Sequence, residues 1–185
     1  MKKWFLLLPV LGLLFFAVYC SNGQTNPTQV QRIIIIRHGE KPDQGDNLSC
    51  QGLNRALQLA DVLNKKIGVP DYVFVPSINT GKKTGTARMY QTIVPFAVKY
   101  NLRINTKYDV DDYKGIADDV LKRNGTVLLV WEHKAIDNIV KALGLPHSPK
   151  WDDNDFDSIW IITFKDGKPV LSTDKEGINP SATCP

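Results

Sequence analysis

Residues 33–40 read IIIIRHGE, and this stretch determines how the rest of the sequence is interpreted. Four consecutive isoleucines between charged residues are typical of a strand that is buried on both faces of a parallel sheet. The run ends on Arg37 and His38, and Gly39 gives the backbone freedom to turn and to approach a ligand closely. In such sheets, ligands bind just beyond the carboxyl ends of the strands, so both side chains are expected at a ligand-binding edge.

Helical patterns follow at intervals along the chain. Apolar side chains at helical spacing predict a helix over 49–68, with Ser49 as its N-cap and Gly68 as its end. Further helices are predicted at 86–101, in the latter part of 109–125 and at 134–144. In the first of these three, Pro95 should interrupt the helix or delay its start.

Strand patterns lie between these helices. The segment 71–77 is one, ended by Pro76, and the buried run 126–133 is another. Residues 156–171 predict a β-hairpin that turns at 165–168. The alternation predicts an α/β fold, a three-layer α/β/α sandwich with a mainly parallel sheet and helices on both faces.

The composition suits one globular domain. The chain has 185 residues, of which 43% are hydrophobic, enough for a single core. We predict that this domain spans 32–185 after a flexible linker at 21–31. The formal net charge is +4, with no long basic run and no interleaving of aromatic and basic residues, which excludes a nucleic-acid partner.

The first twenty residues have the organisation of a secretory signal. Lys2 and Lys3 precede an apolar run at 4–18, and Cys20 closes it before a polar stretch. A cysteine at this place resembles a bacterial lipoprotein signal, which Cys20 would leave as a lipidated N-terminus; Tyr19 stands where such signals prefer a small residue. We expect export to the cell envelope, periplasmic or at the surface, with membrane contact only through this lipid. The alternative is a membrane-spanning anchor, for which the run is short.

Export would place Cys50 and Cys184 in an oxidising compartment. The tail at 178–185 has few apolar residues and no regular pattern, so a disulfide would hold it to the start of the first helix. Two unpaired thiols are the alternative. The sequence has no CxxC motif and no His/Cys cluster with metal-ligand spacing, so no structural metal and no cofactor are predicted.

The buried run at 126–133 ends on His133, much as the first strand ends on His38. Parallel strands bring both histidines to the same edge of the sheet. A lone histidine is usually a satisfied core or surface residue. Two at two strand ends, one of them between an arginine and a glycine, indicate a shared site.

Four motifs in this order resemble the histidine phosphatase superfamily, which includes the phosphoglycerate mutases and acid phosphatases. RHGE at 37–40 looks like the nucleophile motif, and LSCQGLNRALQLADVL at 48–63 resembles the helix that follows it. ARMYQTIVPFA at 87–97 resembles the segment with a second arginine, here Arg88. GTVLLVWEHKAI at 125–136 resembles the strand that ends on the second histidine. The resemblance covers about 32–144.

Two features depart from the family pattern. Ser77 is separated from Arg88 by INTGKKTGTA, a longer loop that places Lys82 and Lys83 near an entrance. Glu132 precedes His133, where the family more often has a small residue.

The predicted chemistry is phosphoryl transfer to His38. A neutral imidazole can attack phosphorus and form a phosphohistidine that water hydrolyses. Arg37 and Arg88 would hold the phosphoryl oxygens through forked, charge-assisted hydrogen bonds, and His133 would be a further donor. These cations do the work of a metal, so none is required.

The proton donor for the leaving oxygen is not fixed by the sequence. In relatives that have one, it is a carboxylate between the second arginine and the second histidine, and the candidates here are Asp111, Asp112 and Glu132. Further predictions are weaker. Gly39, Glu40 and Lys41 are candidates to line the substrate pocket, Arg55 should pack or pair on the first helix, His147 should be exposed, and Trp151 and Trp160 should lie in the core.

The leading interpretation is an exported, metal-independent phosphatase that hydrolyses a small-molecule phosphomonoester and also binds inorganic phosphate. One alternative is phosphoryl transfer of the phosphoglycerate mutase type, but the chain lacks the extra segments those enzymes use to retain the phosphoryl group. The other is a non-catalytic envelope lipoprotein with a phosphate-binding pocket, against which the intact set of two arginines and two histidines argues. Sugar phosphates, lipid-linked phosphates, nucleotides and phosphoproteins all fit as substrates.

Overall fold

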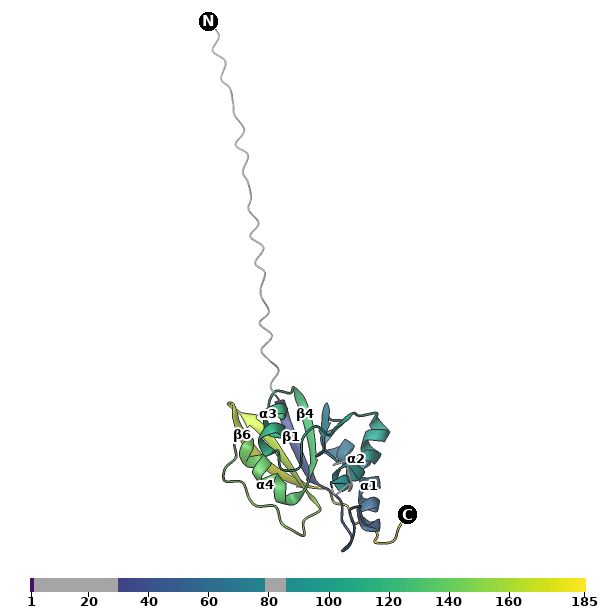
Figure 1. The fold of residues 1–185 in the computed structure, drawn as a ribbon. Helices are drawn as coiled ribbons and strands as arrows, with labels where there is room; N and C mark the ends of the chain where they lie inside the picture. Colours follow the sequence, from purple (N-terminus) through teal and green to yellow (C-terminus); the bar gives the residue numbers. More distant parts are fainter. Residues whose placement is uncertain (2–29, 79–85) are drawn as a thin grey trace.

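The computed structural model describes residue 1, residues 30–78 and residues 86–185. Nearly all of the predicted signal and of the predicted linker (residues 2–29) lies outside these residues, as do Lys82 and Lys83; Figure 1 draws them as a thin grey trace. Within the described part of the chain, no helix is long and apolar enough to cross a membrane.

The described strands form one sheet with the order β3-β2-β4-β1-β5-β6. They are β1 (Val30–Arg37), β2 (Tyr72–Phe74), β3 (Ile104–Asn105), β4 (Gly125–Trp131), β5 (Ser158–Lys165) and β6 (Lys168–Lys175). β1 to β4 pair in parallel, whereas β5 is antiparallel to both β1 and β6. The predicted mainly parallel sheet is confirmed, and the predicted hairpin forms its antiparallel edge.

In the described part of the chain, two helices cover each face of the sheet. The helices are α1 (Cys50–Ile67), α2 (Ala87–Tyr100), α3 (Tyr113–Val120) and α4 (His133–Ala142). Buried residues of α1 and α2 form one core with the sheet, and buried residues of α3 and α4 form another (Figure 1). The predicted three-layer α/β/α sandwich is therefore confirmed.

The four isoleucines of β1 divide between these two cores. Ile33 and Ile35 pack in the core of α3 and α4, and Ile34 and Ile36 pack in the core of α1 and α2. All four are fully buried, because side chains alternate between the faces of a strand and both faces are covered. The strand that carries Arg37 and His38 is thus held from both sides.

The ends of α1 follow the sequence prediction. The Ser49 hydroxyl accepts a hydrogen bond from the Gly52 amide at 3.1 Å, and Gly68 follows the last turn with a positive φ of 74°. The prediction for Pro95 was wrong, because α2 runs through it without a break. Ile93 and Phe96, on either side of the proline, are fully buried, and their packing offsets the missing backbone hydrogen bond.

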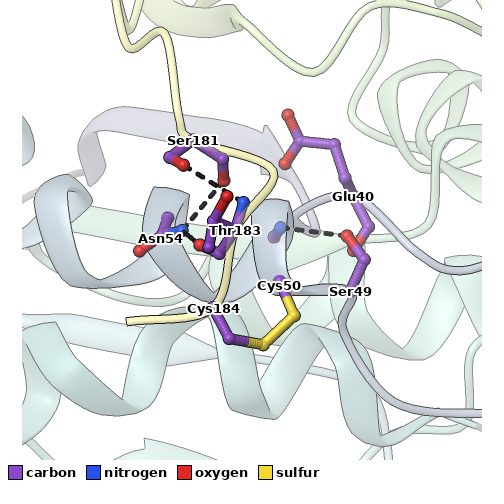
Figure 2. Close-up of a disulfide and its surroundings, with 8 residues drawn as sticks. Glu40, Ser49, Cys50, Asn54, Ser181, Thr183 and Cys184 are labelled. Carbon is purple, nitrogen blue, oxygen red and sulfur yellow. Dashed lines mark hydrogen bonds between the residues drawn. A yellow bond between two sulfur atoms is a disulfide. The ribbon is translucent and has the colours of Figure 1, made fainter.

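The C-terminal tail is attached to α1. Cys184 is bonded to Cys50, which confirms the predicted disulfide, and Figure 2 shows the tail crossing the first turn of α1. The Asn54 side-chain amide donates to the carbonyl oxygens of Ser181 and Thr183 at 2.8 and 2.6 Å. The tail therefore has covalent and hydrogen-bonded attachments to one helix turn.

A buried ion-pair network joins the segment just before the tail to the loop after β1. The Arg55 guanidinium donates to the Glu40 carboxylate at 2.8 Å and to the Glu176 carboxylate at 2.7 Å. Burial raises the pKa of Glu176 to about 7; the charge of Arg55 opposes this shift, and nearby Glu40 adds to it. The prediction that Arg55 pairs on the first helix is confirmed.

Candidate active site

His38 follows β1 directly and is fixed by its surroundings. Its backbone amide donates to the Trp131 carbonyl at 3.1 Å, which continues the pairing of β1 with β4. The residue is 3% exposed, and its Nδ1 lies 2.7 Å from the Gly39 carbonyl oxygen. Because a carbonyl oxygen only accepts, Nδ1 carries the proton, and Nε2 keeps its lone pair.

The environment of His38 favours the neutral imidazole. Burial lowers the pKa of His38 to about 4, and the positive charges of Arg37, Arg88 and His133 contribute further; the bond to the Gly39 carbonyl opposes them. At neutral pH, the side chain is therefore an uncharged base with an available Nε2. Arg37, Arg88 and His133 are therefore close enough to His38 to act on its charge.

The loop after His38 packs tightly against α1. A Cβ on Gly39 would lie 2.9 Å from the Gly52 carbonyl oxygen, so a side chain at this position has no room. Gly39 does not have a positive φ, and its amide donates to the Thr92 hydroxyl of α2 at 2.9 Å. The glycine is therefore required by close helix packing, whereas the sequence suggested turning freedom.

Arg37 is anchored along one edge of its guanidinium group. Nη1 donates to the backbone carbonyl of Asp153 at 2.6 Å and to that of Asp155 at 3.3 Å. The guanidinium also lies 3.8 Å over the Phe156 ring, which contacts the His38 imidazole edge-on at 6.2 Å. Its Nε is buried and has no hydrogen-bond partner in the described part of the chain. This arrangement holds the guanidinium still and leaves a donor for an anion.

Arg88 supplies a second donor of the same kind. It is half-buried in the first turn of α2, and its Nη1 donates to the Asp46 carbonyl at 3.3 Å. Its Nε is also buried and has no hydrogen-bond partner among residues 30–78 and 86–185. Buried N–H groups are almost always paired, so two unpaired guanidinium donors near one imidazole indicate an anion site.

His133 is the first residue of α4, because β4 ends at Trp131 and Glu132 is the N-cap. The sequence prediction of a strand extending to His133 was therefore wrong, although the residue still lies at this sheet edge. Its Nε2 is 3.1 Å from the Asp153 carboxylate, so Nε2–H is the donor. Burial lowers the pKa of His133, with a further contribution from Arg37, and Asp153 opposes the shift.

The three predicted proton donors lie in different settings. Asp112 caps α3, where its carboxylate accepts from the Gly115 amide at 2.9 Å, and Asp111 is exposed. Glu132 is half-buried; burial lowers the pKa of both Arg37 and His133, and the charge of Glu132 opposes both shifts. By position, Glu132 is the best placed of these three.

The predicted pocket residues and several others can also be located. The Glu40 carboxylate accepts from Arg55 and so faces the ion-pair network, whereas Lys41 is exposed. His147 is exposed as predicted. Trp151 and Trp160 are buried with their ring centroids 4.7 Å apart, which confirms their place in the core.

Sequence reasoning missed an acidic loop, residues 151–157 (WDDNDFD), which contributes Asp153, Asp155 and Phe156 to the site. The loop precedes β5, and β5 is antiparallel to β1, so its start lies beside the carboxyl end of β1. If the sequence prediction had paired the hairpin with β1, it would also have placed this loop at the site. No group of three or more potential metal-ligating side chains occurs among the described residues.

Comparison with known proteins identifies the fold. No protein family model matches the chain, and no curated protein matches its sequence. Many solved structures are similar, and three of them match over most of their length. A phosphoserine phosphatase from Entamoeba histolytica in complex with 3-phosphoglyceric acid has a TM-score of 0.56 and 17% identity, covering 78% of this chain and 96% of that one.

The other two are also phosphatases. The protein histidine phosphatase SixA, complexed with tungstate, has a TM-score of 0.56 and 15% identity, covering 78% of this chain and 97% of that one. A mycobacterial glucosyl-3-phosphoglycerate phosphatase with inorganic phosphate has a TM-score of 0.55 and 14% identity, covering 78% and 95%. The chain therefore shares the fold of these three phosphatases, which is the fold that the resemblance of the motifs implied.

Proposed function

We propose that this protein is a histidine-type phosphatase that hydrolyses a phosphomonoester through a phosphohistidine on His38. The observation that carries the proposal is a buried, neutral imidazole with an available Nε2 beside two unpaired guanidinium Nε–H donors. Nucleophilic attack on phosphorus needs the first feature, and neutralisation of the phosphoryl oxygens needs the second.

The residues have separate roles in the proposed reaction. Arg37 and Arg88 bind the phosphoryl oxygens through Nε, while the backbone carbonyls and the Phe156 ring keep Arg37 in place. His38 Nε2 attacks phosphorus, and its Nδ1–H remains bonded to the Gly39 carbonyl, which stabilises the charge that the imidazole acquires. His133 donates to a phosphoryl oxygen. The side chains supply the charge that a metal supplies in other phosphatases, so the reaction is proposed to be metal-independent.

The similar structures support a phosphatase acting on a phosphorylated substrate, because phosphoserine phosphatase, glucosyl-3-phosphoglycerate phosphatase and SixA share this fold. Mutase-type transfer and non-catalytic phosphate binding are the alternative functions. The substrate proposed here is a small-molecule phosphomonoester.

The test is a panel of phosphomonoesters, including sugar phosphates, phosphoserine and p-nitrophenyl phosphate, assayed for phosphate release by residues 21–185 in EDTA. We expect turnover that persists with the chelator. Activity restored only by a divalent cation would contradict the metal-free mechanism. If no ester releases phosphate but the protein still binds inorganic phosphate, the non-catalytic alternative is favoured. If the phosphoryl group moves between organic acceptors and no inorganic phosphate is released, the mutase alternative is favoured.

We also propose that the protein is exported and lipid-anchored at Cys20. The support is the order of a basic start, an apolar run and a cysteine in residues 1–20. Mass spectrometry of the native protein should find a diacylglyceryl-modified Cys20 as the first residue. An unprocessed Met1, or cleavage beyond Cys20 without lipid, would contradict the proposal.

A further inference from the structure

Asp153 contacts the proposed phosphoryl site and is exposed to solvent. Its Oδ1 is 3.1 Å from His133 Nε2, and its backbone carbonyl is 2.6 Å from Arg37 Nη1. The Asp153 side chain is 73% exposed, whereas that of His133 is 12% exposed. The residue thus contacts two groups of the proposed site while its carboxylate remains open to proton exchange with water.

The in-line geometry of phosphoryl transfer determines where a proton donor must lie. Phosphoryl transfer places the attacking and leaving oxygen or nitrogen atoms roughly in line on opposite sides of phosphorus. The nucleophile His38 is 3% exposed and forms the buried end of that line. The leaving oxygen is therefore expected on the solvent side of phosphorus, and the Asp153 carboxylate is exposed to that solvent.

We propose that Asp153 is the general acid that protonates the leaving oxygen; this inference rests on the proposed phosphatase function. The His38 Nε2 lone pair forms the N–P bond, the P–O bond to the leaving group breaks, and the Asp153 carboxyl proton passes to that oxygen, which leaves as an alcohol. Water then attacks the phosphohistidine, the N–P bond breaks, and inorganic phosphate leaves with both protons of that water, which restores His38; the exposed Asp153 carboxylate regains its proton from solvent.

Substrate binding would change the hydrogen-bond partner of Asp153. In the free protein, its carboxylate accepts the His133 Nε2–H that a phosphoryl oxygen would accept in the complex. Once the phosphoryl group takes this hydrogen bond, Asp153 loses that partner and faces a new negative charge. The carboxyl group is then released from His133 and is available to the leaving oxygen.

The acidic loop fixes the backbone of Asp153, while its carboxylate points to a partner outside the loop, His133. The Trp151 indole donates to the Asp155 carbonyl at 2.9 Å, and the Asp155 carboxylate accepts from the Ser158 amide at 2.9 Å. Trp151 is itself buried in the core. The loop is therefore a firm support that can present one carboxyl group repeatedly at the same place.

The experiment compares two substrates with different needs for a proton. An alkyl phosphate such as glycerol phosphate releases a poor leaving group that requires protonation, whereas p-nitrophenyl phosphate releases a stable phenolate that does not. We expect Asp153→Asn to lower kcat for the alkyl phosphate by about 10²-fold or more. With p-nitrophenyl phosphate, kcat should remain close to that of the wild type.

Asp152→Asn is the matched control, since it removes the same charge from the neighbouring exposed residue. Its side-chain oxygen accepts from the Asn154 amide at 2.7 Å, and asparagine can keep this bond. The control should keep wild-type kcat on both substrates, so a parallel loss in Asp152→Asn would assign the effect to loop charge and overturn the proposal.

Three other outcomes would overturn the role of Asp153. An equal loss on both substrates would indicate a positioning residue. A lower KM with unchanged kcat would indicate that the carboxylate merely blocks the empty pocket. If Glu132→Gln lowered kcat for the alkyl phosphate alone and Asp153→Asn did not, the general acid would be Glu132. Failure of the wild type to hydrolyse either substrate would instead contradict the proposed function, which separates the two hypotheses.

Discussion

Replacing His38 with alanine should abolish phosphatase turnover, with kcat falling by roughly 10⁴-fold or more. The variant removes the atom that attacks phosphorus, and no described neighbour can replace it, since His133 Nε2 is already committed as a hydrogen-bond donor to Asp153. Anion binding should persist, because the guanidinium donors of Arg37 and Arg88 remain. The measurements are kcat on the best substrate and the affinity for vanadate.

A rapid acid-free quench of the wild type should also trap an acid-labile phosphohistidine, which His38→Ala should not form. His147→Ala is the matched control, because that histidine is exposed and lies in the loop after α4. It should keep both full turnover and the trapped intermediate. Near-wild-type activity of His38→Ala would contradict its role as nucleophile, and so would a trapped phosphohistidine in that variant.

The charge state of His38 gives an independent check. Because burial and three neighbouring cations lower the pKa of His38 to about 4, its imidazole should titrate far below the ordinary histidine range. An NMR titration should therefore show one histidine that stays neutral at pH 6 in the free protein. A His38 that titrates near pH 6.5 would contradict the environment described for the nucleophile.

Much of the site could be predicted because its determinants are local. The unbroken run Ile33–Ile36 required a strand covered on both faces, and the structure divides those side chains between two cores. Arg37 and His38 then had to lie at the carboxyl edge of the sheet. The same logic located His133, even though the chain turns into a helix one residue earlier than predicted.

The acidic loop could not be predicted in the same way, because its place depends on pairing between distant segments. Nothing local in WDDNDFD shows that β5 pairs with β1, over a hundred residues earlier in the sequence. Short-range patterns also gave the wrong outcome for Pro95, where burial of Phe96 and its neighbours outweighs local preference. The residues most open to error were therefore those whose positions depend on tertiary contacts.

Removing the disulfide should produce the largest loss of stability among the predicted changes. The bond joins residues 134 positions apart, and such a long loop corresponds to about 5 kcal/mol in the chain-entropy model, whereas measured losses are about 2 to 5 kcal/mol. The double variant Cys50→Ser/Cys184→Ser should lower the free energy of unfolding in urea by that amount. Since small proteins have only about 5–15 kcal/mol in total, the change should be unmistakable.

Turnover should remain close to the wild-type value at temperatures where the double variant is folded. The Asn54 amide still holds the tail on α1, and the Arg55–Glu176 pair holds the segment just before it. The Gly39–Gly52 contact, which fixes the loop that carries the nucleophile, does not involve the tail. Reduction of the wild type with dithiothreitol should reproduce the stability loss and should not affect the double variant. Two free thiols at positions 50 and 184 in denatured, unreduced protein would contradict the disulfide. A clear loss of kcat in the folded double variant would show instead that the bridge supports the active site directly, through the first turn of α1.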